Sequence, residues 1–110
     1  MAAYVRTKRV GTYEYYQLVE NHRIDGKPRQ NVLIHLGEHP TVDDALKKWP
    51  TEIKRLRRYA AKERESAKTW PETSGRHRNM LERAASTDKR ADSLEANLKK
   101  LRELRKEGIV

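Results

Sequence analysis

The first third of the chain alternates apolar and polar side chains in three short runs, at residues 4–10, 13–24 and 30–36. Such alternation is typical of β-strands with one buried face. Asp25 and Gly26 stand between the second and third runs. This pair favours a two-residue hairpin turn in which both residues take a positive φ. The pattern therefore predicts a three-stranded antiparallel sheet whose second hairpin turns at Asp25-Gly26.

The second run departs from strict alternation. In a regular strand, the even-numbered Leu18 and Ile24 would lie on one face and the odd-numbered Gln17 and Val19 on the other, so neither face is wholly polar. An extra residue or a strong local twist would bring both parities toward a core. We therefore expect a β-bulge or a twist near Val19 and Glu20.

A helix is predicted to begin at Thr41. The Thr41 hydroxyl can cap the first turn, and Asp43 and Asp44 lie where the helix dipole favours negative charge. Apolar residues then recur at helical spacing, at Val42, Ala45, Leu46 and Trp49. Pro50 lacks a backbone N–H and disfavours helical geometry in the residue before it, so we expect this helix to end or bend at Pro50.

Sparse apolar residues at three-, four- and seven-residue spacings follow Pro50, in segments that are otherwise rich in Lys and Arg. They predict two further helices, at about residues 51–69 and 76–107. The break at residues 70–75 contains Pro, Ser and Gly, which oppose helix continuation. Gly108 is a natural C-terminal stop for the last helix.

The predicted fold class is α+β: a three-stranded antiparallel sheet with one packed helix, followed by a long basic helical or coiled-coil extension. Residues 1–49 would form the sheet-and-helix domain, and residues 50–110 the extension. The last helix carries an apolar stripe at near-heptad spacing, at Ala91, Leu94, Leu98, Leu101 and Leu104. This stripe can fold back on the preceding helix or pair with a second copy of the chain. We favour a homodimer, because Ala60 and Ala67 offer an intramolecular partner little area.

The 110 residues include 25 Lys and Arg against 16 Asp and Glu, and the formal net charge is +9. A charge of this size favours polyanionic partners such as nucleic acid. The chain has no Cys, which excludes disulfides and thiolate metal sites. No apolar run in the sequence reaches the roughly 18 residues of a membrane span, and the N-terminus lacks a secretory signal. We therefore expect a cytoplasmic protein that binds no membrane.

Catalytic and cofactor motifs are absent from the sequence, which has no glycine-rich phosphate loop and no nucleophile elbow. The four His residues form no helical metal-ligand pair, since His35 and His39 straddle Gly37. We therefore expect neither enzymatic activity nor a metal or cofactor site.

Basic residues gather at the strand ends, at the predicted hairpin tip and in the helix after Pro50. Arg and Gln side chains can read base edges through pairs of hydrogen bonds, and Lys and Arg contact phosphates. In the last helix, basic and acidic residues interleave, which is typical of a solvated helix exterior. The predicted nucleic-acid-binding residues are Arg6, Lys8, Arg9, Arg23, Lys27, Arg29, Gln30, Lys54, Arg55, Arg57 and Arg58.

Aromatic residues are few, and the chain has no Phe. We expect Trp49, Tyr4 and the cluster of Tyr13, Tyr15 and Tyr16 to supply most of the aromatic core. For Tyr15, stacking against bases stays open as an alternative to cross-strand packing.

Residues 15–20, 23–27, 29–30 and 33–37 read YYQLVE, RIDGK, RQ and LIHLG. Over residues 4–46, this series resembles the small β region that opens insertion-sequence DDE transposases. In those transposases a long catalytic domain follows, and we expect this chain to lack it. The resemblance thus implies end-binding or DNA docking alone. The order of three strands, a Gly and a helix is also similar to the arm-binding domains of tyrosine integrases, in which a three-stranded sheet enters the major groove.

The sequence therefore favours a small, non-enzymatic DNA-binding protein of bacteria or a mobile element, which docks through a basic β-hairpin and a basic helix. Duplex DNA is the favoured partner. Two alternatives stay open: an adaptor whose coiled coil binds other proteins, and a basic protein associated with RNA or the ribosome. Binding to duplex DNA and duplex RNA across a salt series separates these hypotheses.

Overall fold

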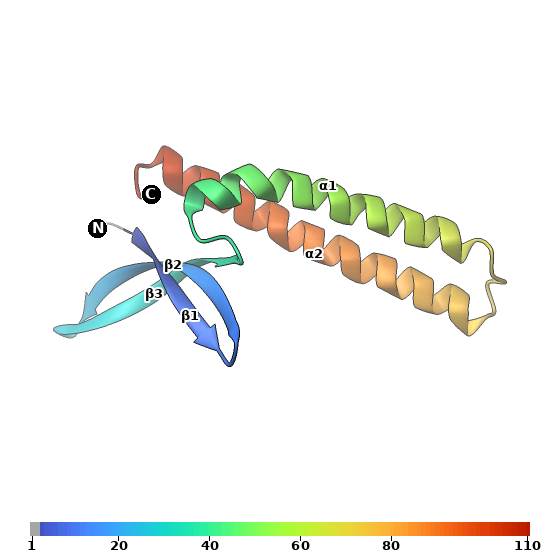
Figure 1. Ribbon diagram of the computed structural model, residues 1–110, viewed down its shortest axis with the longest axis horizontal. Helices are drawn as coiled ribbons and strands as arrows, with labels where there is room; N and C mark the ends of the chain where they lie inside the picture. Colours follow the sequence, from blue (N-terminus) through green and yellow to red (C-terminus); the bar gives the residue numbers. More distant parts are fainter. Residues whose placement is uncertain (1–2) are drawn as a thin grey trace. The chain divides into compact units, whose positions relative to one another are not determined.

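Within residues 3–110, the chain forms three strands and two helices (Figure 1). The computed structural model describes residues 3–110. In chain order, the elements are β1 (Ala3–Val10), β2 (Tyr13–Ile24), β3 (Lys27–Gly37), α1 (Val42–Ala67) and α2 (Gly75–Lys106). The predicted α+β class and the predicted sheet are confirmed.

In the sheet, β2 lies between β1 and β3, and both pairings are antiparallel. The turn from β2 to β3 is made by Asp25 and Gly26, whose φ angles are 54° and 75°. Few residue types take a positive φ without strain, and Gly, Asn and Asp lead among them. The prediction of a hairpin turn at this dipeptide is therefore confirmed, with its physical reason.

Two irregularities interrupt the pairing of β2 with β3. At each of them β3 contributes an extra residue, Leu36 at the first and Leu33 at the second. The second irregularity falls between Leu18 and Val19, which confirms the expected bulge near Val19. Because β3 has this extra residue, Val32 pairs with Val19 on one face of the sheet, and Ile34 pairs with Leu18 on the other.

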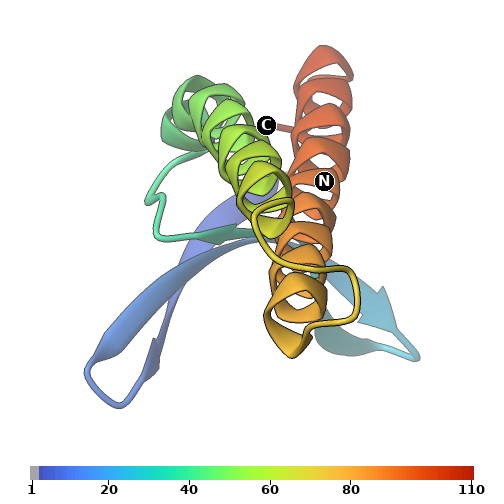
Figure 2. The same cartoon turned by 90° about the vertical axis from the view of Figure 1, so that its right-hand side faces the viewer.

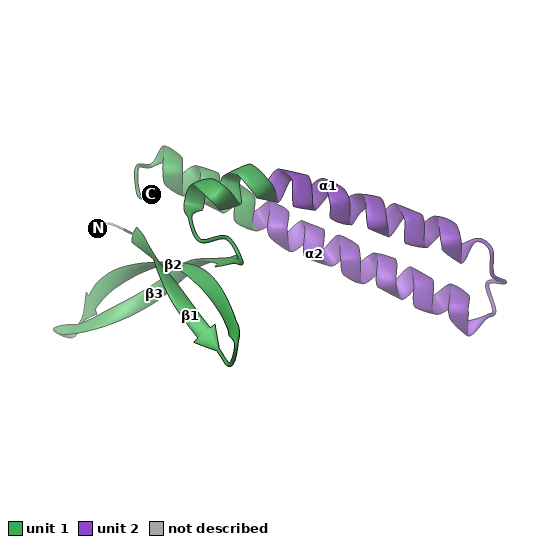
Figure 3. Ribbon diagram, viewed as in Figure 1, with its two compact units in different colours: residues 1–48, 97–110 green, residues 49–96 purple. Residues whose placement is uncertain are grey.

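The chain divides into two compact units, shown in different colours in Figure 3. Unit 1 contains residues 1–48 and 97–110, and unit 2 contains residues 49–96. The sequence predicted domains at residues 1–49 and 50–110, and that division stays a prediction.

The core of unit 1 is aliphatic. Two polar contacts tie the end of α2 to the rest of this unit. Lys100 Nζ donates a hydrogen bond to the backbone carbonyl of Leu33 at 2.8 Å, and Arg105 forms an ion pair with Asp43. The buried aliphatic residues of unit 1 are Leu18, Val19, Ile34, Leu36, Val42, Ala45, Leu98 and Leu101. A sheet this small thus completes its core with residues from both helices.

Side chains cap both helices at their N-termini. The Asp44 amide donates to Thr41 Oγ1 at 3.0 Å, as predicted for α1, and the His77 amide donates to Ser74 Oγ at 3.1 Å at the start of α2. Each hydroxyl satisfies a backbone donor that lacks a partner within the helix. Gly108 follows α2 with a φ of 77°, which confirms the predicted stop.

Of the two outcomes expected at Pro50, the end of the helix is wrong, as is the predicted start of a new helix near residue 51, whereas a bend stays a prediction. α1 continues through Pro50, which leaves the Leu46 carbonyl without its usual donor. Apolar residues keep their helical spacing across this point, and Trp49 and Ile53 are only 2% and 7% exposed. Burial of one continuous apolar stripe offsets the lost hydrogen bond.

In unit 2, the α1 and α2 segments lie side by side and run antiparallel (Figures 1 and 2). Four alanines are each at most 1% exposed, two on each helix at a seven-residue spacing: Ala60, Ala67, Ala84 and Ala91. Small side chains at a repeated position let two helices approach closely. The chain therefore folds back here, although the small area of these alanines seemed a reason to expect a dimer. Coiled-coil character stays a prediction.

Candidate nucleic-acid interface

The strand pairing places a set of polar side chains on one face of the sheet. Arg6 lies opposite Gln17 on β2, and Gln17 lies opposite His35 on β3. Paired residues of neighbouring strands point to the same side of a sheet. We call this side the open face, and its polar and aromatic residues are Tyr4, Arg6, Lys8, Tyr13, Tyr15, Gln17, Asn21, Arg23, Gln30 and His35. All of them except Gln17 are exposed or half-buried.

Hydrogen bonds join the centre of the open face across all three strands. Arg6 donates to Gln17 Oε1 from Nε at 3.0 Å and from Nη2 at 2.8 Å, and its Nη1 donates to Gln30 Oε1. Gln17 Nε2 lies 3.2 Å from His35 Nδ1. Gln17 is only 4% exposed, so these contacts satisfy the polar atoms of a buried amide.

The network continues along the open face toward the β2–β3 hairpin. Gln30 Nε2 donates to the Tyr4 hydroxyl at 2.7 Å, and that hydroxyl donates to Asn21 Oδ1 at 3.3 Å. The bond between Arg6 and Gln30 crosses the row of the sheet that holds Val19, which is 0% exposed. The polar side chains thus cover an apolar position and hold one another in place.

Arg9 lies on the opposite side of the sheet from Lys8. It forms an ion pair with Glu14, its partner in the β1–β2 pairing. The hydrogen bond that Arg9 donates to the Glu14 carboxylate, and then the negative charge of that carboxylate, raise the pKa of the Arg9 guanidinium. Of these two neighbouring basic residues, Lys8 therefore points to the open face and Arg9 is engaged by an acidic partner.

The tip of the β2–β3 hairpin brings several predicted residues together. Arg23 and Gln30 lie on the open face, whereas Lys27 and Arg29 lie on the other side of the ribbon. All four are exposed, so both sides of this two-stranded tip face solvent. A hollow at the tip is lined by Asn21, His22, Arg23, Pro28, Arg29 and Gln30.

A second basic surface lies on α1 in unit 2. A hollow there is lined by Arg55, Arg58, Tyr59 and Lys62, and Tyr59 is 56% exposed. Lys54 is also exposed on this helix. Tyr59 and Lys62 are not among the residues predicted from the sequence, although their helical spacing from Arg55 and Arg58 was the signal that could have found them.

Arg57 differs from its basic neighbours because it turns toward α2. Its guanidinium lies 3.2 Å from Asp88 Oδ1, 2.7 Å from Asp92 Oδ1 and 3.1 Å from Glu95 Oε2. The hydrogen bond to Asp92 is the largest cause that raises the pKa of Arg57. The structure therefore places this predicted nucleic-acid-binding residue inside an intramolecular ion-pair cluster, which Arg64 joins through Asp88.

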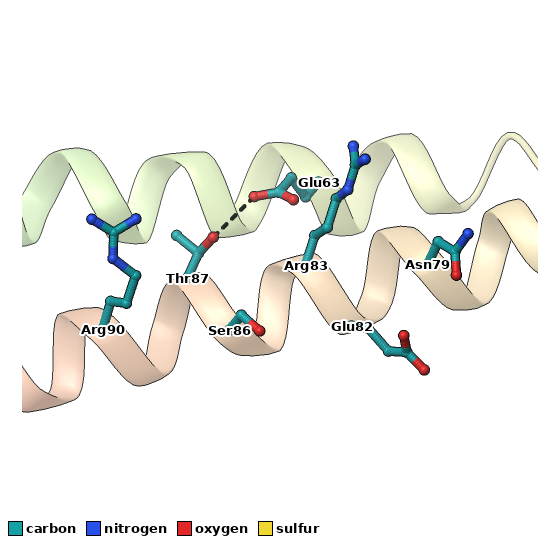
Figure 4. A pocket seen from close by; sticks show the side chains of 7 residues that line it. All are labelled: Glu63, Asn79, Glu82, Arg83, Ser86, Thr87 and Arg90. Atoms are coloured by element: carbon teal, nitrogen blue, oxygen red, sulfur yellow. Dashed lines mark hydrogen bonds between the residues drawn. The ribbon is translucent and has the colours of Figure 1, made fainter.

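A hollow between the two helices of unit 2 contains charges of both signs (Figure 4). Thr87 Oγ1 on α2 donates to Glu63 Oε1 on α1 at 3.2 Å, the contact drawn in that figure. Arg83 and Arg90 lie one turn before and one turn after Thr87. Because Glu63 lies among these arginines, the hollow lacks the single positive sign that favours a phosphate.

The predicted dimer stripe on α2 is largely buried within the chain itself. Ala91 and Leu101 are 0% exposed and Leu98 is 5% exposed, whereas Leu94 and Leu104 are half-buried. A homodimer through this helix stays a prediction, but its driving force is smaller than the sequence suggested. Its test is the sedimentation of the unmodified chain, because substitutions in the stripe such as Leu98→Asp or Leu101→Asp would also disturb the core of unit 1.

The expected aromatic core is only partly present. Trp49 is 2% exposed, as expected, but Tyr4 and Tyr13 are 39% and 61% exposed. The Tyr13 and Tyr15 rings lie 6.5 Å apart on the open face. The prediction that Tyr4 and Tyr13 fill the core is therefore wrong, because both side chains are exposed.

A small basic α+β module with a polar, partly aromatic sheet face is the class that this fold and surface define. The model of one family, the N-terminal domain of the IS1634 family transposase, matches residues 3–74. The match covers more than half of the chain, so the chain belongs to this family. It confirms the resemblance to insertion-sequence transposases and extends it through α1. No curated protein and no solved structure matches the chain.

Neither helix in residues 3–110 combines the length and the apolar character that a bilayer crossing requires. The likeness to arm-binding domains of tyrosine integrases stays a prediction.

Proposed function

We propose that this chain is a DNA-binding module of a mobile element and that it docks on duplex DNA through the open face of its sheet. The observation that carries the proposal is the row of Arg, Lys, Gln, Asn and Tyr side chains on one face of the sheet, all of them exposed or half-buried except Gln17. These residue types supply most protein contacts to phosphates and base edges. Membership of a transposase family supports DNA as the polyanion.

The shape of the sheet also supports duplex DNA. The major groove of B-form DNA admits a β-ribbon, whereas the major groove of duplex RNA is too narrow for side chains to read. The β2–β3 hairpin extends as a two-stranded ribbon beyond the last residue that β1 pairs, with Arg23, Lys27 and Arg29 near its tip. The ribbon would enter the groove, and these basic side chains would contact the phosphates that border it.

The basic surface of α1 is proposed as a further phosphate contact. Arg55, Arg58 and Lys62 line one hollow with the exposed ring of Tyr59, whose hydroxyl can also donate to a phosphate oxygen. This role is one of binding alone, and we propose no chemical step for it. A homodimer and a cytoplasmic location stay predictions.

Neighbouring residues of β1 provide a matched test. Lys8→Gln and Arg9→Gln remove the same charge, but Lys8 lies on the open face and Arg9 is paired with Glu14. Fluorescence anisotropy with a labelled DNA duplex should show that Lys8→Gln weakens binding several-fold more than Arg9→Gln. Equal losses would mean that the chain attracts DNA through overall charge and not through this face.

A further inference from the structure

The hydrogen-bond network of the open face fixes which way each amide points. An Arg guanidinium carries only donors, so both Gln17 and Gln30 must turn their carbonyl oxygens toward Arg6. The amide nitrogen of Gln17 then faces His35 Nδ1, which must accept. The network thus assigns the neutral His35 ring with its proton on Nε2.

This ordering leaves donors on the open face. The side-chain carbonyl oxygens of Gln17 and Gln30 accept from Arg6, and the side-chain carbonyl oxygen of Asn21 accepts from Tyr4. A guanidinium has five N–H groups, and the contacts to Gln17 and Gln30 use one on Nε, one on Nη2 and one on Nη1. One N–H therefore stays on each terminal nitrogen of Arg6, and His35 carries its own Nε2–H.

We propose that Arg6 is a base-reading residue that selects guanine in the major groove, an inference that rests on the proposed DNA binding. Guanine presents two acceptors there, N7 and O6, which match the two remaining N–H groups of one guanidinium. Adenine presents a donor beside its N7, and that donor would face the Arg6 donors without a partner. His35 would donate to a neighbouring acceptor from its Nε2–H.

The position of Arg6 favours a base over a phosphate. It lies on β1 beside Gln17, a residue of the central strand that is 4% exposed, and not at the hairpin tip, where Arg23 and Arg29 are exposed. Two Gln side chains hold its guanidinium, so little side-chain entropy is lost when it meets a planar partner. Gln17 and Gln30 are in this sense positioning residues for Arg6.

Selection from a duplex library with randomised central positions tests the assignment. The unmodified chain should enrich guanine at one or more positions, and Arg6→Lys should lower that preference about tenfold or more. The control Arg9→Lys makes the same change on the same strand, away from the open face, and should keep the preference. Thermal unfolding of each variant establishes that it is folded. An Arg6→Lys variant that keeps the guanine preference would overturn the inference.

Modified bases repeat the test on the unmodified chain. In the selected duplex, 7-deazaguanine at the preferred position removes the N7 acceptor and should weaken binding about tenfold. Inosine keeps both major-groove acceptors and loses only the minor-groove amino group, so it should bind nearly as well as guanine. Tight binding to both modified duplexes would overturn the inference and leave the proposed DNA binding intact. Failure to bind any duplex in a salt-dependent manner would instead overturn the proposed function.

Discussion

Arg57 on α1 and Asp92 on α2 are 35 residues apart in sequence, and Arg57 Nη2 lies 2.7 Å from Asp92 Oδ1. This contact gives Arg57 a different role from Arg58, the next residue in the chain, which lines the basic hollow of α1. One of the two stabilises the pairing of the helices, and the other faces solvent. A run of basic residues on a helix thus divides between structure and binding according to the face on which each residue lies.

Replacement of each of these residues by Gln should separate the two roles. Arg57→Gln leaves the carboxylates of Asp92 and Glu95 without their cation, so it should lower the melting temperature of the chain. Arg58→Gln should leave the melting temperature nearly unchanged. It should lower by about 1 the magnitude of the salt slope, which is the slope of the logarithm of the DNA-binding constant against the logarithm of the salt concentration. Circular dichroism and anisotropy measure the two effects. Loss of DNA binding through Arg57→Gln in a chain that melts normally would contradict this assignment.

The hairpin tip should matter more for DNA than an equal charge on α2. We expect that Arg23→Gln, Lys27→Gln and Arg29→Gln together lower the magnitude of the salt slope by about 3, because each residue would contact a phosphate. The dissociation constant, measured between low and physiological salt on one duplex, gives this slope.

The control carries the same loss of three charges on α2, at Lys89, Lys99 and Lys106, which are all exposed. Lys100 is left out because it donates to the Leu33 carbonyl and so has a structural contact. The control should change the slope by less than about 1. If both triple variants lose the same affinity, the chain behaves as a diffuse polycation.

Local signals in the sequence identified most of the elements. The Asp25-Gly26 turn, the Thr41 cap and the Gly108 stop each depend on a few neighbouring residues, and each is confirmed. At Pro50 the prediction relied on a local rule, the low helix propensity of proline, and did not take into account the burial of apolar residues on both sides of it. Tertiary packing overrides a low helix propensity when one apolar stripe keeps its helical spacing through the unfavourable residue.

The candidate site was harder to predict than the fold. Arg6 was recognised by its charge, but Gln17 and His35 were not, because their importance depends on the register that sets them beside Arg6. Arg9 and Arg57 were included because charge alone does not reveal an acidic partner. Such partners come from other strands or helices, which a pattern along one segment does not show.

The close pairing of the helices in unit 2 should depend on small side chains. Ala60→Leu would place extra volume at a position that is 0% exposed and should lower the free energy of unfolding by about 1–3 kcal/mol. The neighbouring Ala61 is exposed, so Ala61→Leu should change the free energy of unfolding by less than about 0.5 kcal/mol. Urea unfolding measures both. If Ala60→Leu leaves the free energy of unfolding unchanged, the helices do not pack closely at residue 60.

Acid should weaken unit 1 through Asp44. Its carboxylate lies 3.2 Å from Lys48 Nζ and 3.2 Å from His39 Nδ1, and Lys48, followed by His39, lowers the pKa of Asp44 below its ordinary value near 3.8. Because the folded pKa is the lower one, this contribution to stability is full above the ordinary value and is lost as the pH falls through the folded pKa. Melting temperatures between about pH 6 and pH 2 should therefore fall more steeply for the unmodified chain than for Asp44→Asn. Identical pH profiles for the two chains would show that Asp44 does not contribute to the loss of stability in acid.

The salt dependence of binding to duplex DNA tests the central claim most directly. If the hairpin tip and the basic surface of α1 together engage about six phosphates, the logarithm of the binding constant should fall with the logarithm of salt at a slope of roughly −5. Duplex RNA of the same sequence should bind more weakly, because its major groove does not admit the ribbon. An affinity for DNA that stays flat between low and physiological salt would contradict the proposed function.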